Sequence, residues 1–507
     1  MNKSDINLKI NFLLLILSLF FSIIYFNDQV AVRGGLTLSG EVEYKFNNSP
    51  LKYYFLNSWT IVTQLAALFF KLGFSTSLVS FSLVFLVTCI YFYSSYLLII
   101  KFTDNKILSV IVSCFLIFFQ KNLGDTDYPS FIFTAHTFGA LAQALTGLII
   151  ACVFTNRLKI ALFLSLLLIS VHPIVGIWLI SLFFLFLLIF YQKFEIKSFV
   201  SSFLAGFLIL AISIGFYLYS SIETLDYSKD LFQIYIEKWD GHRANTGQIH
   251  YEYLIKSLIF ILLINFIIHK KKEFKTGLFF LNLVMISSSA IYLLFKIFYL
   301  NKFQIFSMII PGRLIITYTF ILWPILLGLL YNKFMHKKIF TKFFYFLIIL
   351  YSLMHYKNFL ILEKSFKNIN IIFNLEDKKN IYTILKNIDE TGNIIATEHT
   401  GDYVINISKK PLLLMKSFDY MPYHPYLINK LVEILTEVYG YNFNDPYIKN
   451  YPYLKDEFIK KIFENKSQRD WIKIKEKFNA EYLITPKEWD IKMKPIHTDN
   501  KNNLFKI

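Results

Sequence analysis

Charged and histidine side chains that could do chemistry occur in polar segments between long apolar runs of this chain. The first such segment spans residues 27–72 and carries Glu41 and Glu43 directly after the first apolar run. A carboxylate held at a membrane surface could serve as a general base or as a metal ligand. An outer loop also tolerates acidic residues without any catalytic role, so both interpretations stay open.

A second polar segment carries Asp125 and Asp127, a D-x-D pair shortly before Pro129. Paired carboxylates at this spacing can bind a divalent cation such as Mg²⁺ or Mn²⁺, which in turn would neutralise a phosphate. The pair also fits ordinary turn chemistry, because aspartate is common where a chain turns.

His172 and Pro173 interrupt an apolar run over residues 158–191. The proline breaks the helix, so two short spans replace one long span and His172 lies at the turn between them. An ionisable side chain at membrane depth is a functional candidate, although a histidine at such a turn can also be a polar cap.

A later polar segment gathers Trp239, His242 and Arg243. An aromatic ring can stack on a sugar, and an arginine binds phosphate oxygens with two parallel hydrogen bonds. The alternative is a polar loop with a tryptophan at the membrane interface.

Arg313 follows a Pro-Gly pair and precedes another apolar run. A guanidinium group in these surroundings is costly unless it pairs with an acid or with an anionic ligand. We therefore predict that Arg313 contacts a lipid phosphate; the alternative is an anchor whose charge reaches the interface.

The elements that must position these residues are apolar helices. The chain has 507 residues, of which 55% are hydrophobic, and its mean hydropathy is +0.48. These values predict a mainly α-helical, multi-spanning membrane bundle of about eleven spans. The net charge of +17 is explained by basic inner loops and a lysine-rich tail, so no nucleic-acid partner is expected. The predicted spans are residues 8–26, 75–100, 107–119, 138–154, 158–171, 174–191, 199–220, 254–268, 276–295, 314–330 and 340–356.

The charge distribution predicts the topology. If the N-terminus is cytoplasmic, the basic loops fall inside and most acidic residues fall in outer loops, as the positive-inside rule expects. Counting residues 51–72 as a span would reverse every later loop. We therefore predict an amphipathic helix in the outer interface there, with Asn57, Thr60, Gln64 and Lys71 on one face.

The composition changes near the end of the last predicted span and suggests two domains, 1–357 and 358–507. The second reads as a small extracytoplasmic α/β domain. Its expected strands are residues 393–397, 411–415, 481–485 and 504–507, and its expected helices include 426–439 and 468–478.

Taken together, the chain resembles the GT-C type of membrane glycosyltransferase, in particular poorly characterised bacterial members. The resemblance rests on the acidic first outer loop Gly-Glu-Val-Glu-Tyr at 40–44, the interface helix, the many spans and the outer domain. Within that domain it rests on residues 408–415 (Ser-Lys-Lys-Pro-Leu-Leu-Leu-Met), 421–425 (Met-Pro-Tyr-His-Pro) and 479–484 (Asn-Ala-Glu-Tyr-Leu-Ile).

The resemblance implies an inverting hexosyl or pentosyl transfer in the bacterial cytoplasmic membrane. The donor would be a polyprenyl-phosphate sugar, and the acceptor a glycan, lipid or protein of the cell envelope. A first-loop carboxylate would be the base, and Arg313, Arg243 or a metal at Asp125 and Asp127 would stabilise the leaving phosphate. Many relatives carry Asp or Asp-Glu where this chain has Glu41 and Glu43, so the identity of the base stays open.

Three other classes of protein compete with the transferase. A transporter would explain the spans, but paired broken helices are expected of it. An O-antigen ligase or polymerase would concentrate several arginines in one large outer loop. A non-catalytic membrane protein whose outer domain binds a partner is the third.

Overall fold

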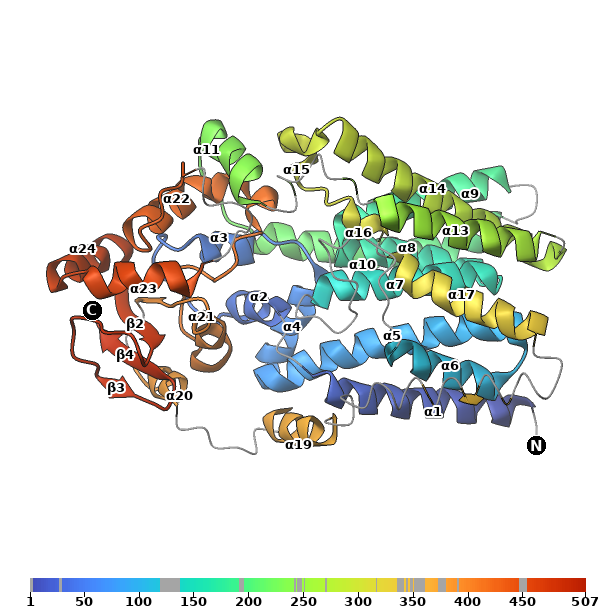
Figure 1. The fold of residues 1–507 in the computed structure, drawn as a ribbon, viewed down its shortest axis with the longest axis horizontal. Helices are drawn as coiled ribbons and strands as arrows, with labels where there is room; N and C mark the ends of the chain where they lie inside the picture. Colours follow the sequence, from blue (N-terminus) through green and yellow to red (C-terminus); the bar gives the residue numbers. More distant parts are fainter. Residues whose placement is uncertain are drawn as a thin grey trace.

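The computed structural model describes residues 3–26, 30–118, 137–190, 196–240, 243, 249, 251–269, 271–315, 317–334, 342, 345–346, 350, 361–372, 380–389, 392–445 and 454–507. These residues form a mainly helical molecule with one small sheet near the C-terminus (Figure 1). The long apolar helices are α1 (Lys3–Ile24), α5 (Thr76–Thr103), α6 (Lys106–Phe118), α7 (Thr137–Phe154), α8 (Leu158–Val171), α9 (Pro173–Ile189), α10 (Val200–Ser220), α13 (Tyr251–Ile268), α14 (Lys275–Ile297) and α17 (Thr317–Phe334).

Each predicted span up to residues 314–330 coincides with one of these helices to within a few residues. Residues 340–356 lie largely outside the described part. Among the described helices, three are long and apolar enough to cross a membrane: Thr76–Thr103, Lys197–Ser220 and Lys272–Ile297. The other apolar helices are shorter. The structure thus agrees with a membrane-associated helical protein.

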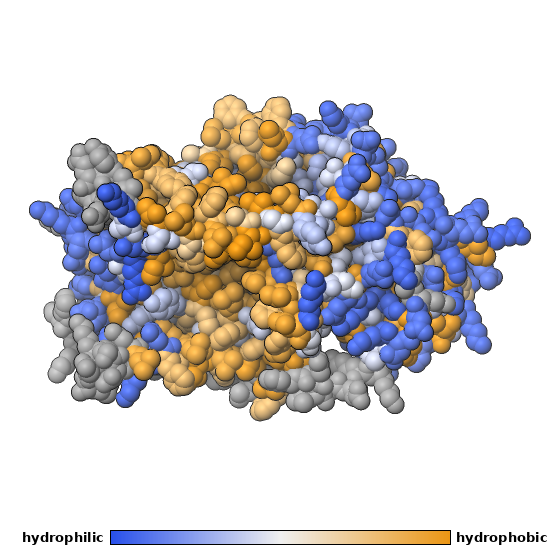
Figure 2. Space-filling model, turned by 180° about the vertical axis from the view of Figure 1, so that it is seen from behind, coloured by the Kyte–Doolittle hydropathy of each residue, from blue (hydrophilic) through white to orange (hydrophobic). Residues whose placement is uncertain are grey.

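The face of the bundle seen in Figure 2 is largely apolar. Figure 2 shows hydrophobic side chains over the helices and hydrophilic side chains at both ends of the molecule. On α10, for example, Leu204, Phe207, Leu208 and Ile212 are all more than half exposed. Such a continuous apolar surface is expected of helices that face lipid.

The basic turns predicted to be cytoplasmic meet at one end of the bundle. Lys101 in the last turn of α5 and Lys271 before α14 place their ammonium groups 5.5 and 5.7 Å from the ring centre of Phe274. Asn332 near the end of α17 donates to the carbonyl of Phe102. Figure 1 shows the N-terminus at this same end and the C-terminus at the opposite end.

The segment after α1 folds differently from the prediction. Residues 27–72 contain three helices, α2 (Val30–Ser39), α3 (Pro50–Leu56) and α4 (Ile61–Lys71), in place of a loop and one interface helix. The predicted polar stripe does not lie on one face, because the helix breaks between α3 and α4. Asn57 ends α3, and the Thr60 side chain caps the N-terminus of α4.

Small residues let α2 lie directly against α4. A Cβ atom on Gly35 would come within 2.6 Å of the Ala66 Cβ, and one on Gly34 within 3.0 Å of Thr63. Gln64 then fixes α4 to α10, because its side-chain amide donates to the Ser213 carbonyl at 2.8 Å. This layer of short helices covers the end of the bundle opposite the N-terminus (Figure 1).

The C-terminal part contains a four-stranded sheet with the order β1-β2-β4-β3. Its strands are β1 (Asn393–Ile395), β2 (Ala480–Pro486), β3 (His497–Thr498) and β4 (Asn502–Lys506). β1 pairs with β2 in parallel, and the other pairs are antiparallel. The predicted strand 411–415 forms only an isolated bridge, between Ile394 and Leu412.

Helices surround this sheet. They include α20 (Ile381–Lys386), α22 (Ile428–Glu437), α23 (Asp456–Asn465) and α24 (Gln468–Phe478), and α24 has the bounds predicted from the sequence. A reciprocal capping box between Ser467 and Asp470 starts α24. Farther up the chain, α19 (Ile361–Ile372) is tied to α1, since Asn368 donates to the Ile23 carbonyl at 2.7 Å.

Residues 411–427 join the C-terminal part to the layer of short helices. The Ser49 hydroxyl lies 2.9 and 3.0 Å from the carbonyls of Leu412 and Leu413. Tyr235 in the π-helical turn η3 (Tyr235–Trp239), which follows α11 (Lys229–Ile234), donates to the Phe418 carbonyl at 2.9 Å. The turns η8 (Met421–Tyr423) and η9 (Pro425–Leu427) continue from there. This junction positions the candidate site.

Candidate functional site

Arg313 lies at the junction, in the short helix α16 (Gly312–Ile315) that precedes α17. Its Nη1 donates to the Tyr423 hydroxyl at 3.0 Å and lies 3.1 Å from Nε2 of His172. Because a guanidinium can only donate, Nε2 of His172 is the acceptor and Nδ1 carries the proton of the neutral ring. Three segments far apart in the sequence thus converge on one guanidinium group.

His172 is held at the turn where α8 ends and α9 begins with Pro173 at its first position. The Thr60 hydroxyl donates to the neighbouring Val171 carbonyl at 3.0 Å, which fixes this turn against the start of α4. His172 is 6% exposed. Within the described part of the chain, its buried Nδ1 has no hydrogen-bond partner.

Arg243 is the second guanidinium at the junction, and only 1% of its surface is exposed. Its Nη1 lies 2.5 Å from Oδ2 of Asp240, and its Nε donates to the carbonyl of Ser307 in α15 (Gln304–Ser307). Burial acts to lower the pKa of Arg243, but the Asp240 carboxylate together with the phenol groups of Tyr423 and Tyr235 more than offsets this effect, and the pKa is raised. The guanidinium carbon lies 5.6 Å from the centre of the Tyr423 ring.

We call these five residues the arginine cluster: Arg313, Arg243, Asp240, His172 and Tyr423. Tyr423 contacts both guanidinium groups and so joins the two halves of the cluster. The Nη2 of Arg243 is buried and has no hydrogen-bond partner among the described residues. The cluster therefore holds two guanidinium groups, one buried carboxylate and unused hydrogen-bond donors.

A pair of tyrosines lies beside the arginine cluster. Tyr54 in α3 stacks on Tyr420, with ring centres 4.3 Å apart, and the His424 ring meets Tyr54 edge-on at 5.3 Å. Burial raises the pKa of both tyrosines, so their hydroxyls stay protonated. The buried Tyr420 hydroxyl has no hydrogen-bond partner in the described part.

This arrangement suits an anionic ligand. Buried hydrogen-bond donors normally have partners, and each one left unsatisfied costs about 1–3 kcal/mol. The oxygens of a phosphate group would satisfy unused donors such as those of Arg243 and His172. Arginine is also the side chain best suited to bind phosphate through two hydrogen bonds.

The structure brings Arg313, Arg243 and His172 together, three of the residues selected from the sequence. It places Trp239 in the core instead: the indole is fully buried, stacks on Phe443 at 5.2 Å and donates to the Phe443 carbonyl at 2.9 Å. Its ring therefore has no face left for a sugar. His242, Asp125 and Asp127 lie outside the described residues.

The two first-loop glutamates make their contacts outside the arginine cluster. Glu41 pairs with Lys409, and Glu43 is exposed, while Val42 between them is buried. In the described part, no hydrogen bond or ion pair joins either glutamate to the cluster.

Asp240, Tyr423 and Asp419 were not selected from the sequence, although signals for them existed. Asp240 directly follows Trp239, and Tyr423 lies inside the 421–425 pattern. Asp419 lies two residues before that pattern.

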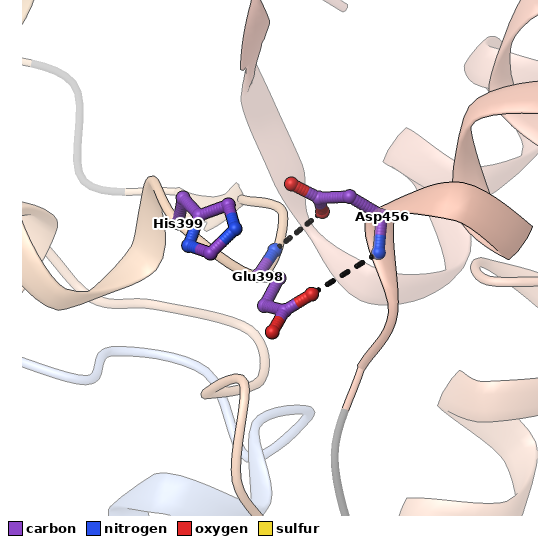
Figure 3. Close-up of side chains that lie close together, drawn as sticks. All are labelled: Glu398, His399 and Asp456. Atoms are coloured by element: carbon purple, nitrogen blue, oxygen red, sulfur yellow. Dashed lines mark hydrogen bonds between the residues drawn. The ribbon is translucent and has the colours of Figure 1, made fainter.

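A second polar cluster lies in the C-terminal part, where Glu398, His399 and Asp456 meet (Figure 3). One ligand atom from each lies within 4.8 Å of the others. Asp456 accepts the backbone N–H of Glu398 at 2.8 Å, and Glu398 accepts that of Asp456 at 3.3 Å. An imidazole with two carboxylates could hold a divalent cation, and this donor set suits Mn²⁺ or Zn²⁺ better than Mg²⁺.

Comparison with known proteins identifies no relative: no protein-family model matches the chain, and neither does any curated protein.

Proposed function

We propose that the protein is a membrane glycosyltransferase that moves a sugar from a polyprenyl-phosphate donor to an acceptor of the cell envelope. The observation that carries the proposal is the arginine cluster, in which Arg313 and Arg243 share Tyr423 where the apolar bundle meets the C-terminal part. A ligand with a phosphate group and a long apolar tail matches this junction, because the phosphate would bind the arginine cluster and the tail would lie along the apolar bundle.

Charge supports a phosphate that gains negative charge during the reaction. A polyprenyl-phosphate sugar is a phosphodiester with one negative charge, and the polyprenyl phosphate that leaves carries up to two. Fixed cationic donors placed where charge develops stabilise the transition state more than the ground state. The arginine cluster supplies such donors, because Arg313 and Arg243 each bring a guanidinium group and the carboxylate of Asp240 binds Arg243.

The proposal includes a topology of about eleven spans in a bacterial cytoplasmic membrane. The N-terminus and the basic turns around Phe274 would be cytoplasmic, and residues 358–507 would form an extracytoplasmic domain. The common location of Lys101 and Lys271 at the N-terminal end of the bundle supports this orientation. The arginine cluster would then lie at the outer surface.

A divalent cation would be held by Glu398, His399 and Asp456, or by Asp125 and Asp127 outside the described residues. Such an ion supplies positive charge for phosphate or hydroxyl oxygens. The arginine cluster already supplies positive charge for the leaving phosphate, so the mechanism derived from it needs no metal step.

The proposal is tested by sugar transfer in membranes that contain the protein, with a panel of polyprenyl-phosphate sugars as donors. We expect Arg313→Met to lower the transfer rate by about 100-fold or more, because a donor to the developing charge is lost. Arg157→Met is the matched control. Arg157 also donates to a tyrosine hydroxyl, that of Tyr93 at 2.9 Å, but it follows α7 at the start of α8.

Wild-type membranes that transfer no sugar from any donor of the panel would overturn the proposal. Full activity in Arg313→Met would overturn it too. Equal losses in Arg313→Met and Arg157→Met would show a loss of folding in place of a loss of phosphate binding.

A further inference from the structure

We infer that Asp419 is the base that accepts the proton of the acceptor hydroxyl, in place of a first-loop glutamate. This inference rests on the proposed glycosyl transfer and assigns a residue to the step that the arginine cluster leaves open. Three observations support it: the position of the turn that carries Asp419, the absence of a hydrogen bond or ion pair to its carboxylate oxygens among the described residues, and the unpartnered hydroxyl of the neighbouring Tyr420.

The turn at residues 418–423 places Asp419 at the junction. Met421 N–H donates to the Phe418 carbonyl at 3.2 Å, and Tyr423 N–H donates to the Tyr420 carbonyl at 3.0 Å. Tyr423 at the end of this turn binds Arg313. Four residues before Tyr423, Asp419 is thus fixed by the same turn that carries the contact to the arginine cluster.

Asp419 and Arg313 act on a common neighbour. The Asp419 carboxylate interacts electrostatically with the phenol groups of Tyr54, Tyr235 and Tyr420, and the Arg313 guanidinium interacts with that of Tyr54. A carboxylate and a phosphate-binding cation thus lie around one stacked tyrosine pair. An acceptor hydroxyl and a donor phosphate need this arrangement to react with each other.

The Asp419 carboxylate is available for chemistry. It is half-buried, and within the described part of the chain no hydrogen bond or ion pair engages its oxygens. Of the competing carboxylates, Asp240 pairs with Arg243 and Glu41 pairs with Lys409, while Glu43 is exposed and has no hydrogen bond or ion pair to the arginine cluster among the described residues. A carboxylate whose oxygens already bind a cation has fewer lone pairs left to accept a proton than a free one.

The buried hydroxyl of Tyr420 gives an independent sign of a ligand. Tyr420 is 3% exposed, and its hydroxyl has no partner in the described part. A donor directly next to Asp419 in the sequence would be satisfied by a ligand hydroxyl, whose oxygen accepts from Tyr420 while its proton points to Asp419. This pair of contacts would orient a sugar hydroxyl or a similar alcohol.

The reaction balances with these groups alone. The proton of the acceptor O–H passes to the Asp419 carboxylate, and the acceptor oxygen forms a bond with the anomeric carbon of the donor sugar. The bond between that carbon and the phosphate oxygen breaks, and its electron pair stays on the phosphate beside Arg313 and Arg243. The proton on Asp419 is then released to water.

The experiment uses the full chain in lipid nanodiscs with the polyprenyl-phosphate sugar that the wild-type protein uses. It measures kcat and KM across pH for Asp419→Asn, Asp419→Glu and Asp226→Asn. Asp226 is the matched control, because it is an exposed aspartate near the same junction, where its carbonyl accepts from Asn429 at 3.3 Å. Binding of polyprenyl phosphate is measured separately for each variant.

We expect Asp419→Asn to lower kcat by about 100-fold or more, as loss of a general base does. Its affinity for polyprenyl phosphate should stay within about threefold, and Asp419→Glu should recover part of kcat. Asp226→Asn should match the wild type.

A wild-type kcat in Asp419→Asn would overturn this inference and leave the proposed transfer intact, especially if Glu41→Gln or Glu43→Gln were inactive. A loss of polyprenyl-phosphate binding equal to the loss of kcat would also overturn it, because Asp419 would then only hold the fold. A wild-type protein that transfers no sugar would overturn the proposed function itself.

Discussion

The two polar clusters of this molecule differ in how their hydrogen bonds are satisfied. At Glu398 and Asp456, each carboxylate accepts the backbone N–H of the other residue, and His399 is exposed to solvent (Figure 3). In the arginine cluster, Arg243 and His172 are buried, and each keeps a donor without a partner among the described residues.

This difference separates a cluster whose contacts stabilise the fold from one whose unpartnered donors do not. Reciprocal bonds between Glu398 and Asp456 join the 396–400 turn to the start of α23, which is a sufficient structural role. Unsatisfied buried donors lower stability by about 1–3 kcal/mol each. Selection for stability alone would not retain them, so the arginine cluster is the better candidate for function.

The largest effect expected from this comparison is that of Asp240→Asn. The substitution leaves the Arg243 guanidinium buried without its carboxylate, and loss of one partner of a buried pair costs about 3–5 kcal/mol. We expect the free energy of unfolding in detergent to fall by this amount, measured by denaturant titration with tryptophan fluorescence.

Two further variants sharpen this test. Glu41→Gln removes the partly exposed pair with Lys409 and should cost no more than about 1 kcal/mol. Adding Arg243→Met to Asp240→Asn should recover stability, because no unpaired charge then stays buried. Equal losses of unfolding free energy in Asp240→Asn and Glu41→Gln would mean that the buried Asp240–Arg243 pair contributes no more to stability than a partly exposed pair.

The second test compares His424, which contacts Tyr54 beside the arginine cluster, with His399 of the second polar cluster. Burial lowers the pKa of His424 to about 3, and its ring bonds Tyr426 at 2.9 Å, whereas His399 is exposed. The unfolded chain binds a proton on this histidine below its ordinary pKa of about 6.5, and the folded protein does not. The contribution of neutral, buried His424 to the free energy of unfolding is therefore fully present above about pH 6.5 and is lost as the pH falls toward 3.

At about pH 5 this loss amounts to roughly 2 kcal/mol. We expect the wild type and His399→Asn to lose stability equally between about pH 7 and pH 5, and His424→Asn to lose less. Thermal unfolding at a series of pH values measures this. The same pH slope in all three proteins would show that His424 is accessible to protons in the folded state.

The sequence predicts the helices of the bundle well and the layer of short helices poorly. Apolar runs form helices because local composition decides it, so α5 and α10 lie where expected. The break between α3 and α4 depends on tertiary contacts: Thr60 caps α4 and also bonds the Val171 carbonyl. The predicted strand at 411–415 fails because two of its carbonyls bind the Ser49 hydroxyl instead of a neighbouring strand.

The candidate site shows the same limit. Arg313 and His172 could be selected from the sequence because an ionisable side chain among apolar residues is costly without a reason. Tyr54 and Tyr420 could not, since they are ordinary aromatic residues more than three hundred positions apart. Only the folding of the 418–424 turn against α3 reveals that they stack.

The smallest expected effect concerns a metal at Glu398, His399 and Asp456. Each carboxylate already accepts a backbone N–H, so one oxygen of each and the exposed imidazole are left for a cation. We expect Mn²⁺ to bind weakly, and at a concentration equal to its Kd it should raise the free energy of unfolding by only about 0.4 kcal/mol. Mn²⁺ titration followed by electron paramagnetic resonance measures the binding, and thermal unfolding measures the gain in stability.

His399→Ala should abolish the Mn²⁺ binding and the gain in stability, while His424→Asn should keep both. If a chelator lowered the free energy of unfolding by several kcal/mol, the contrast between the two clusters would fail, because the cluster of Glu398, His399 and Asp456 would then also depend on a ligand that the fold alone does not supply.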